Sequence, residues 1–285
     1  MGEPARRLPE PAPLGPDSAA WRYLGDRTAL LGAGSALLLQ VSHPVIGAGV
    51  ADHSNFLDEP WARLERTLTS TFTLVFGGDT AAGEGRRLRE LHTTIKGVDR
   101  QGRRYHALDQ HAYWWVHASL FVTIVKMSRY VGPRIPVAEL PQLYAEWRQA
   151  GELLGIPDRV MPRNLTAFRA YTDRVLREQL EDNETVHDVL GALRLDGVGS
   201  PPWWFLPEQA WDLAKPAGRG VLELTTIGLL PSTVRATLGL EWTRRDEWQL
   251  RAFGQIVRRS MPLVPARARQ FPIPYAAKRA AGVGS

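Results

Sequence analysis

The chain has 285 residues and no cysteine, an absence that excludes several kinds of site at once. Disulfide bonds, iron–sulfur clusters, thiolate-ligated haem and cysteine zinc sites all require a sulfur ligand that this chain lacks. A chain without disulfides is consistent with a reducing compartment, and we therefore expect a cytoplasmic location.

Lysine is also scarce, because only four of the 35 basic residues are lysine and the other 31 are arginine. The net charge is +5, and the basic residues are scattered along the sequence with a modest excess at both ends. A nucleic-acid interface needs a dense basic stripe beside base-reading or stacking groups. The sequence shows no such stripe, so we expect no nucleic-acid partner.

Long hydrophobic runs are missing as well. The longest, residues 29–41, has 13 residues and includes two glycines and a serine, whereas a helix that spans a bilayer needs about 20 apolar residues. The first 19 residues are rich in proline and do not have the apolar core of a secretory signal. We expect no transmembrane segment, and a flexible, disordered lead-in over residues 1–19.

Strand-type alternation is almost absent, whereas helical periodicity recurs between proline and glycine residues. The sequence therefore predicts an all-α protein, with a single globular multi-helix domain over residues 20–262 and a loosely ordered C-terminal tail over residues 263–285. The nearly all-apolar residues 110–130 predict a long central buried helix. The other predicted helices are residues 20–42, 60–76, 80–96, 136–154, 165–180, 220–229, one after Pro231, and 243–258. Residues 182–219 are expected to be irregular, with the tryptophans of residues 203–211 in the core or in a lid.

The stretch from residue 86 to residue 117 holds the most informative pattern, a histidine on the apolar face of a predicted helix. Leu88, Leu91, His92 and Ile95 fall at positions i, i+3, i+4 and i+7, so His92 shares a face with its apolar neighbours. A histidine directed into a helical core is either a structural residue or a ligand. Residue chemistry alone favours the structural role.

Other motifs are weaker. Gly32-Ala-Gly34 is similar to the start of a dinucleotide fingerprint, but it lies within a predicted helix and lacks the third glycine. We therefore interpret these small residues as positions where two helices pack closely. Glu184-x-x-His187 has the spacing of a di-iron motif but occurs once, among acidic residues typical of a solvated helix start. No histidine pair has the spacing of a zinc protease site, and no Gly-x-Ser-x-Gly elbow is present.

A series of short motifs occurs in a fixed order along residues 20–280. They include Ser42-His43-Pro44, Gly49-Val50-x-x-His53-Ser54, Pro60-x-x-Arg63-x-x-Arg66-Thr67, Leu91-His92-x-x-Ile95-Lys96-Gly97, Gly102-x-x-Tyr105-x-Ala107, Trp115-Val116-His117-Ala118, Gly228-Leu229-Leu230-Pro231-x-x-x-Arg235 and Gly239-Leu240-x-Trp242. Each motif is weak alone. In number, order and spacing they resemble the MpaB-type and latex-clearing-protein (rubber oxygenase) superfamily, long catalogued as a domain of unknown function.

The resemblance implies a fold, a cofactor and a site. That family is all-helical, and its characterised members resemble haem b proteins that use dioxygen to oxidise or cleave isoprenoid or other unsaturated carbon chains. The resemblance places His92 as the axial ligand of the haem iron, with Arg63, Arg66, Thr67 and Lys96 near the haem pocket. Arg63 would hold charge and Thr67 would donate a hydrogen bond to bound oxygen. It therefore implies a haem-dependent oxygenase whose partners are dioxygen and a hydrophobic small molecule.

Ordinary residue chemistry is compatible with this implication. A neutral imidazole is a common haem ligand, and its other ring nitrogen needs an acceptor that the sequence does not identify. Arginine suits haem propionates because its planar fork matches a carboxylate; the candidates are Arg63, Arg66, Arg86, Arg89 and Arg103. His117, in the middle of the aromatic helix, is the alternative axial ligand, and the preference for His92 rests mostly on the resemblance.

The chain also differs from the latex-clearing branch. It is shorter, it lacks a recognisable distal acidic base, and Arg66 stands where that branch has lysine. These differences weigh against polyisoprene cleavage but not against haem binding. Two other functions stay open, a non-catalytic haem carrier or sensor and a haem-free helical protein that binds a lipid-like ligand. Whether the chain forms a homo-oligomer is also open.

Overall fold

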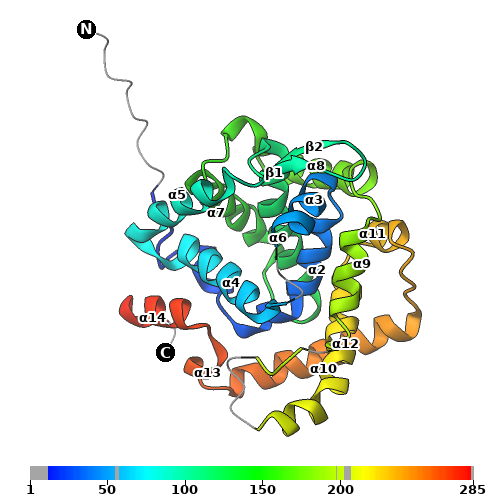
Figure 1. Cartoon of the computed structure of the whole chain (residues 1–285). Helices are drawn as coiled ribbons and strands as arrows, with labels where there is room; N and C mark the ends of the chain where they lie inside the picture. Colours follow the sequence, from blue (N-terminus) through cyan, green and yellow to red (C-terminus); the bar gives the residue numbers. More distant parts are fainter. Residues whose placement is uncertain (1–11, 55–57, 197, 202–206, 284–285) are drawn as a thin grey trace.

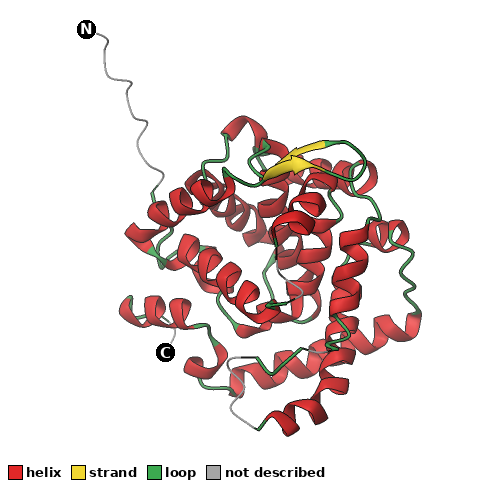
Figure 2. Ribbon diagram, in the orientation of Figure 1, coloured by secondary structure: helices red, strands yellow, loops and turns green. Residues whose placement is uncertain are grey.

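The computed structural model describes residues 12–54, 58–196, 198–201 and 207–283. In this part of the chain, fourteen α-helices pack around one main core and are joined by short 3-10 helices (Figure 1). Figure 2 shows that the strands among these described residues form one small hairpin at one edge of the helical body. The predicted all-α fold in one domain is therefore confirmed, with a minor addition of strand.

The elements follow one another along the chain in two halves. The first half comprises α1 (Ala19–Tyr23), η1 (Arg27–Ala29), α2 (Leu30–Val41), α3 (Pro44–His53), α4 (Pro60–Phe76), η2 (Gly78–Thr80), α5 (Ala81–His92), β1 (Lys96–Val98), β2 (Arg104–His106) and α6 (Gln110–Tyr130). The second half comprises η3 (Val137–Glu139), α7 (Leu140–Leu153), η4 (Asp158–Val160), α8 (Leu165–Glu178), α9 (Glu184–Ala192), α10 (Glu208–Leu229), α11 (Ser232–Thr237), α12 (Arg244–Ser260), η5 (Met261–Leu263), α13 (Ala266–Arg269) and α14 (Pro272–Ala280). Strands β1 and β2 pair antiparallel, with Gly97 opposite Tyr105.

Helix α6 is the central helix, as the sequence predicts. It begins where the Asp109 carboxylate accepts hydrogen bonds from backbone N–H groups of the first turn, which is the usual N-cap arrangement. Trp114, Trp115 and Phe121 are fully buried in it, and α2, α7, α10 and α12 all contact it. Helix α6 therefore forms the centre of the core, with the other helices packed around it.

Two glycines let neighbouring helices approach α2 closely. A Cβ at Gly34 would lie 2.1 Å from Thr226 Oγ1 in α10, and one at Gly32 would lie 2.3 Å from Met127 Sδ in α6. A side chain at either position would overlap these atoms unless they shifted, so glycine allows the helices to pack this closely at the two crossings. The interpretation of Gly32 and Gly34 as packing residues is confirmed.

The predicted helix over residues 20–42 is interrupted in the structure. Gly25 has a φ of +100°, and after it η1 leads into α2. Glycine adopts this conformation without strain, and a single glycine in a helical pattern is an ambiguous signal. Pro44 does more than end a helix, because it lies in the first turn of α3, where its missing N–H leaves no bond unmade.

The predicted helix over residues 80–96 is shorter than expected. Helix α5 ends at His92, and Lys96 begins strand β1. Strands of three residues are too short to show the alternation of apolar and polar side chains by which a strand is recognised. The hairpin was therefore not predicted, and His92 lies at a helix end rather than within a helix.

The region predicted to be irregular, residues 182–219, contains α9 and the first half of α10. Helix α10 continues through Pro216, although a proline removes one hydrogen bond from a helix interior. Beyond Pro216 the buried residues of α10 are Thr225, Thr226, Gly228 and Leu229, in the part of the helix where Thr226 packs on Gly34 of α2. Trp211 is buried, whereas residues 203–206 of the tryptophan-rich segment lie outside the described residues.

Both ends of the described chain contact the core. Leu14 is buried ahead of α1, and residues 1–11 of the predicted lead-in lie outside the described residues. At the other end, α14 lies against α4 (Figure 1). The Phe271 ring packs on Phe72 with centroids 4.9 Å apart, and buried Lys278 donates to the Leu24 carbonyl over 3.0 Å. The C-terminal tail is thus more regular than predicted, with helices within residues 266–280.

No single helix of the described residues has both the length and the apolar character needed to cross a bilayer. One bent pair of segments, Arg27–Val41 and Pro44–His53, meets the same criteria of length and composition, with an angle of 107° between its two parts. In this structure α2, the main part of the first segment, packs between α6 and α10.

Candidate functional site

His92 is the last residue of α5, and the helix itself sets the orientation of its ring. Nδ1 lies 2.6 Å from the backbone carbonyl oxygen of Leu88, one turn earlier. A carbonyl can only accept a hydrogen bond, so Nδ1 carries the proton and Nε2 keeps the lone pair. The Leu88 carbonyl oxygen is the acceptor that the sequence leaves unidentified. Its hydrogen bond orients the ring and leaves Nε2 as the candidate ligand atom.

Tyr113, in the first turn of α6, packs edge-on against His92 with ring centroids 5.6 Å apart. Its hydroxyl is buried and has no hydrogen-bond partner among the described residues. Burial also raises the pKa of Tyr113 to about 12. A buried hydroxyl without a partner is unfavourable, so this group indicates a place beside His92 where a bound molecule could supply the missing hydrogen bond.

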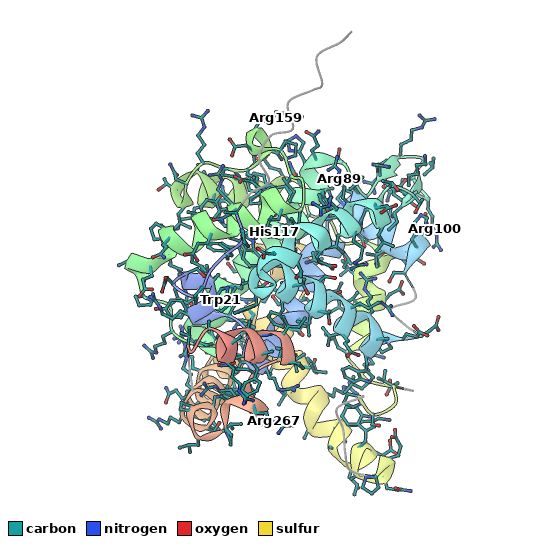
Figure 3. The ribbon with its side chains drawn as sticks, turned by 90° about the vertical axis from the view of Figure 1, so that its left-hand side faces the viewer. Trp21, Arg89, Arg100, His117, Arg159 and Arg267 are labelled. Atoms are coloured by element: carbon teal, nitrogen blue, oxygen red, sulfur yellow. The ribbon has the colours of Figure 1, made fainter. Side chains whose placement is uncertain are left out.

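His117 lies in the interior of the molecule (Figure 3), where it stacks on Trp147 of α7 with centroids 4.5 Å apart. Its Nε2–H donates to the Trp147 carbonyl over 2.7 Å, and the Trp147 indole N–H donates to the His117 carbonyl over 2.9 Å. Burial lowers the pKa of His117 to about 4, so the ring is neutral at pH 7. Because Nε2 is already a donor and one ring face is covered, the geometry favours His92 as the candidate ligand.

Arg63 and Thr67 lie one turn apart on α4, and both line a cavity between α2, α4 and α6. Arg63 donates to Ser54 Oγ, and within the described residues no carboxylate forms an ion pair with it. Burial, together with the neighbouring Arg66, lowers the pKa of Arg63. A half-buried guanidinium without an acidic partner favours the binding of an anionic group.

Thr67 is already engaged within its own helix. Its Oγ1 donates to the Arg63 carbonyl over 3.0 Å, a bond that uses the only proton of the hydroxyl. Toward the cavity, Thr67 therefore offers an acceptor, and the donor role expected from the resemblance requires the hydroxyl to rotate out of this bond.

Two further predicted cofactor residues lie away from the cavity. Arg66 is exposed on α4, with its guanidinium 4.0 Å from Glu59 Oε2. Lys96 is exposed at the start of β1 and borders a separate depression on the hairpin. Arg66 and Lys96 therefore do not line the cavity that Arg63 and Thr67 line.

The other candidate arginines have partners elsewhere. Arg103 lies between Asp99 and Glu181. It donates one hydrogen bond to the Asp99 carboxylate and two parallel hydrogen bonds to the Glu181 carboxylate. Arg89 donates to the Gly155 carbonyl over 3.2 Å. Of the arginines considered for an anionic group, Arg63 is the one placed at the cavity wall.

A cavity of about 680 Å³ lies between α2, α4 and α6. Its wall is mostly apolar and includes Leu37, Leu68, Phe72, Leu120, Ile124 and Met127. Cavities of this size and character are typical of sites for small hydrophobic ligands. The cavity can therefore hold an apolar molecule with Arg63 and Thr67 at its polar margin.

His92 is not part of the wall of this cavity. Tyr113, Leu120 and Ile124 fall at positions i, i+7 and i+11 of α6, so they share one face of that helix. Tyr113 contacts His92, which places His92 beyond the end of the cavity wall. A ligand that reaches both the cavity and Nε2 of His92 must extend past Tyr113.

A second polar cluster, to which the sequence assigned no role, joins α3 to the hairpin. Tyr105 Oη donates to Asp52 Oδ2 over 2.5 Å and lies 3.1 Å from His53 Nε2. Burial and the Asp52 carboxylate raise the pKa of Tyr105 to about 12. Ser54, which follows His53, accepts a hydrogen bond from Arg63. The cluster therefore holds the end of α3 in the place from which Ser54 positions Arg63. The motifs around His53 and Tyr105 mark these residues in the sequence, but they do not indicate that the two side chains meet.

The discounted di-iron spacing stays discounted. Glu184 pairs with Arg100, and His187 pairs with Asp182 over 3.1 Å, at the exposed start of α9. In the part of the chain that the structure describes, no three histidine, aspartate or glutamate side chains come together as a metal-binding group.

Comparison with known proteins yields one family. The family model described as "ER-bound oxygenase mpaB/B'/Rubber oxygenase, catalytic domain" matches residues 21–259. Two curated proteins, one from Mycobacterium bovis and one from Mycobacterium tuberculosis, are each 27% identical over 241 residues, which cover 81% of this chain and 88% of the relative. Both are named as uncharacterized. No solved structure is significantly similar.

Proposed function

Because this chain belongs to the ER-bound oxygenase mpaB/B'/rubber oxygenase family, we propose that it is a haem-dependent oxygenase. Membership in a family of oxygenase catalytic domains supports an enzyme that acts with dioxygen on a substrate. The finer proposal is that the cofactor is haem b and that the substrate is a hydrophobic small molecule, isoprenoid-like or otherwise unsaturated.

The orientation of His92 is the observation that carries the haem proposal. Its Nδ1–H is bonded to the Leu88 carbonyl, which holds the ring in place and leaves Nε2 as the ligand atom. The unpartnered Tyr113 hydroxyl beside it offers a hydrogen bond to a bound group. Haem, if bound, would be held by Nε2 of His92 and would supply a redox-active iron for dioxygen chemistry.

Arg63 and Thr67 have supporting roles in this proposal. Arg63 binds a propionate carboxylate of the haem, because a half-buried guanidinium pairs strongly with such a group. Ser54 keeps the guanidinium in position. Thr67 presents its hydroxyl oxygen one turn away at the same cavity. The apolar wall binds the hydrophobic substrate and excludes water. In this proposal His117 contributes to packing and does not bind the cofactor. A cytoplasmic location stays a prediction.

One observation favours a different function. The apolar cavity is formed without any contribution from His92, as expected for a haem-free protein that binds a lipid-like ligand. The same experiment distinguishes the two functions.

Absorption spectra during titration with haemin test the proposal. We expect the native protein to give a saturable Soret band that is lost or shifted in His92→Ala and retained in His117→Gln. Loss of a charge-assisted hydrogen bond in Arg63→Met should weaken haemin binding by about tenfold or more. The matched variant Arg66→Met removes the same charge from an exposed position and should leave binding nearly unchanged.

Each contrary outcome has a clear meaning. No saturable band in the native protein contradicts haem binding and leaves the lipid-binding function. A band that His92→Ala does not alter contradicts His92 as the ligand. A haem-loaded protein that consumes no dioxygen with any isoprenoid-like substrate indicates a carrier or sensor.

A further inference from the structure

Positive charge is concentrated in the C-terminal helices. Residues 244–283 contain nine basic and two acidic side chains, a net charge of +7, whereas the whole chain carries +5. The rest of the molecule is therefore slightly negative. Figure 3 shows that these helices, marked by Arg267, lie at the end of the molecule away from Arg159.

Helix α12 separates its packing face from a basic face. Leu250 and Gly254 are buried, and Gly254 lies against the Tyr130 carbonyl, where a Cβ would be only 1.9 Å from the oxygen. The opposite face, together with η5 and α13, exposes basic and large apolar side chains. We call this surface the basic C-terminal face, and it consists of Arg244, Arg245, Trp248, Ile256, Arg259, Leu263 and Arg267.

The two acidic residues of this segment offset the charge of the basic C-terminal face only in part, since Asp246 interacts electrostatically with Arg245 alone among the arginines of the face. Asp246 closes the capping box at the start of α12, and Glu247 interacts with Trp242, Tyr130 and Arg251. Within the described residues, no carboxylate forms an ion pair with any arginine of the face, which are Arg244, Arg245, Arg259 and Arg267. These guanidinium groups are therefore available to an anionic partner.

The face also exposes large apolar side chains. Trp248 is 67% exposed, Ile256 is 66% exposed and Leu263 is 84% exposed. Tryptophan and aliphatic side chains interspersed with arginine are typical of surfaces that lie in the headgroup region of a membrane. Arginine alone would suit any polyanion, whereas exposed apolar side chains gain stability only where they leave water.

The basic C-terminal face adjoins the cavity. Arg258, on the inner side of α12, donates to the Ser128 carbonyl over 2.7 Å and to the Gly132 carbonyl over 3.1 Å, and both of these residues line the cavity. In α13, Arg269 lies 3.5 Å from Asp26, another residue of the cavity wall. A surface bound through this face would therefore lie next to one edge of the cavity.

We propose that the basic C-terminal face docks peripherally on an anionic lipid bilayer. The arginines bind the lipid headgroups, and Trp248, Ile256 and Leu263 enter the boundary between headgroups and acyl chains. Docking brings the edge of the cavity close to apolar molecules dissolved in the membrane. The proposal does not depend on the cofactor, and it needs no transmembrane helix.

Vesicle flotation tests the proposal with the full chain. Phosphatidylcholine vesicles with and without phosphatidylglycerol are used, at low and at high salt. We expect the protein to float with the vesicles that contain phosphatidylglycerol and to be released by salt. The triple variant Arg244→Gln, Arg245→Gln, Arg259→Gln should bind at least about tenfold more weakly, because each arginine near an anionic surface strengthens binding about fivefold. Trp248→Ser should weaken binding without any change of charge.

A matched variant controls for net charge. Arg163→Gln, Arg169→Gln, Arg174→Gln removes three exposed arginines at or near α8, at the far end of the molecule in Figure 1, and should float like the native protein. Circular dichroism confirms that each variant is folded. Equal loss of binding in both triple variants overturns the proposal, as does the absence of flotation in the native protein. Binding to duplex DNA or self-association through this face, without flotation, also overturns it in favour of that partner.

Discussion

His117 is buried in its neutral form, and this burial makes the stability of the protein depend on pH. The pKa of His117 is about 4 in the folded protein and about 6.5 in an unfolded chain. The unfolded state therefore takes up a proton at a higher pH than the folded state does. As the pH falls from about 6.5 toward about 4, we expect the free energy of unfolding to decrease by about 3 kcal/mol.

Urea unfolding at a series of pH values measures this effect. His117→Gln keeps an N–H donor for the Trp147 carbonyl but cannot titrate, so its stability should change much less over the same range. A smaller dependence should remain, because burial also lowers the pKa of His43. If the native protein and His117→Gln respond equally to pH, His117 is not the group responsible.

The hairpin depends on a close approach between its two strands. A Cβ at Gly97 would lie 2.6 Å from Tyr105 Oη, whereas one at Gly49 in α3 would lie 3.9 Å from the Tyr105 ring. Gly97→Ala must displace the Tyr105 ring and its hydrogen bond to Asp52, and should destabilise the protein by about 1–3 kcal/mol. Gly49→Ala adds a methyl group at ordinary contact distance within a helix and should be neutral or slightly stabilising.

Thermal unfolding of the two glycine variants gives the comparison, and Tyr105→Phe shows whether the effect passes through the hydroxyl. If it does, Gly97→Ala and Tyr105→Phe together should cost less than the sum of their separate effects. Strict additivity, or a Gly97→Ala variant as stable as the native protein, would contradict the role given to this contact. The hairpin matters beyond its size because it holds the end of α3 that positions Arg63.

For the molecule as a whole, the C-terminal helices complete the core. The Phe271 N–H donates to the Gly25 carbonyl over 3.0 Å, its ring packs on Phe72, and Lys278 donates to the Leu24 carbonyl. Gly25, Phe72 and Leu24 all line the cavity. Removal of residues 265–285 should therefore lower the free energy of unfolding by more than about 3 kcal/mol and expose the cavity.

The midpoint of thermal unfolding and the fluorescence of a dye that binds exposed apolar surface measure both effects. A chain that ends at residue 281 keeps α14 and should behave like the full chain. Should the chain that ends at residue 264 unfold at the same temperature as the full chain, α13 and α14 would be an appendage rather than part of the core.

Features whose signals are local can be predicted from the amino-acid sequence. Helices α4 and α6 begin at Pro60 and Gln110, as predicted. Proline in the first turn of α4 and the Asp109 cap that the structure shows before α6 both act on the adjacent backbone. The shared position of Arg63 and Thr67 at the cavity also follows from their spacing on one helix. Burial of α6 follows from its apolar composition alone.

Contacts between groups that are distant in the sequence become known from the folded structure. The pairing of His117 with Trp147, the contact of Tyr105 with Asp52 and the packing of Phe271 on Phe72 join residues from separate elements. No local pattern encodes them, because a hydrogen bond or a pKa shift depends on which neighbours folding brings within a few ångströms and how far they exclude water.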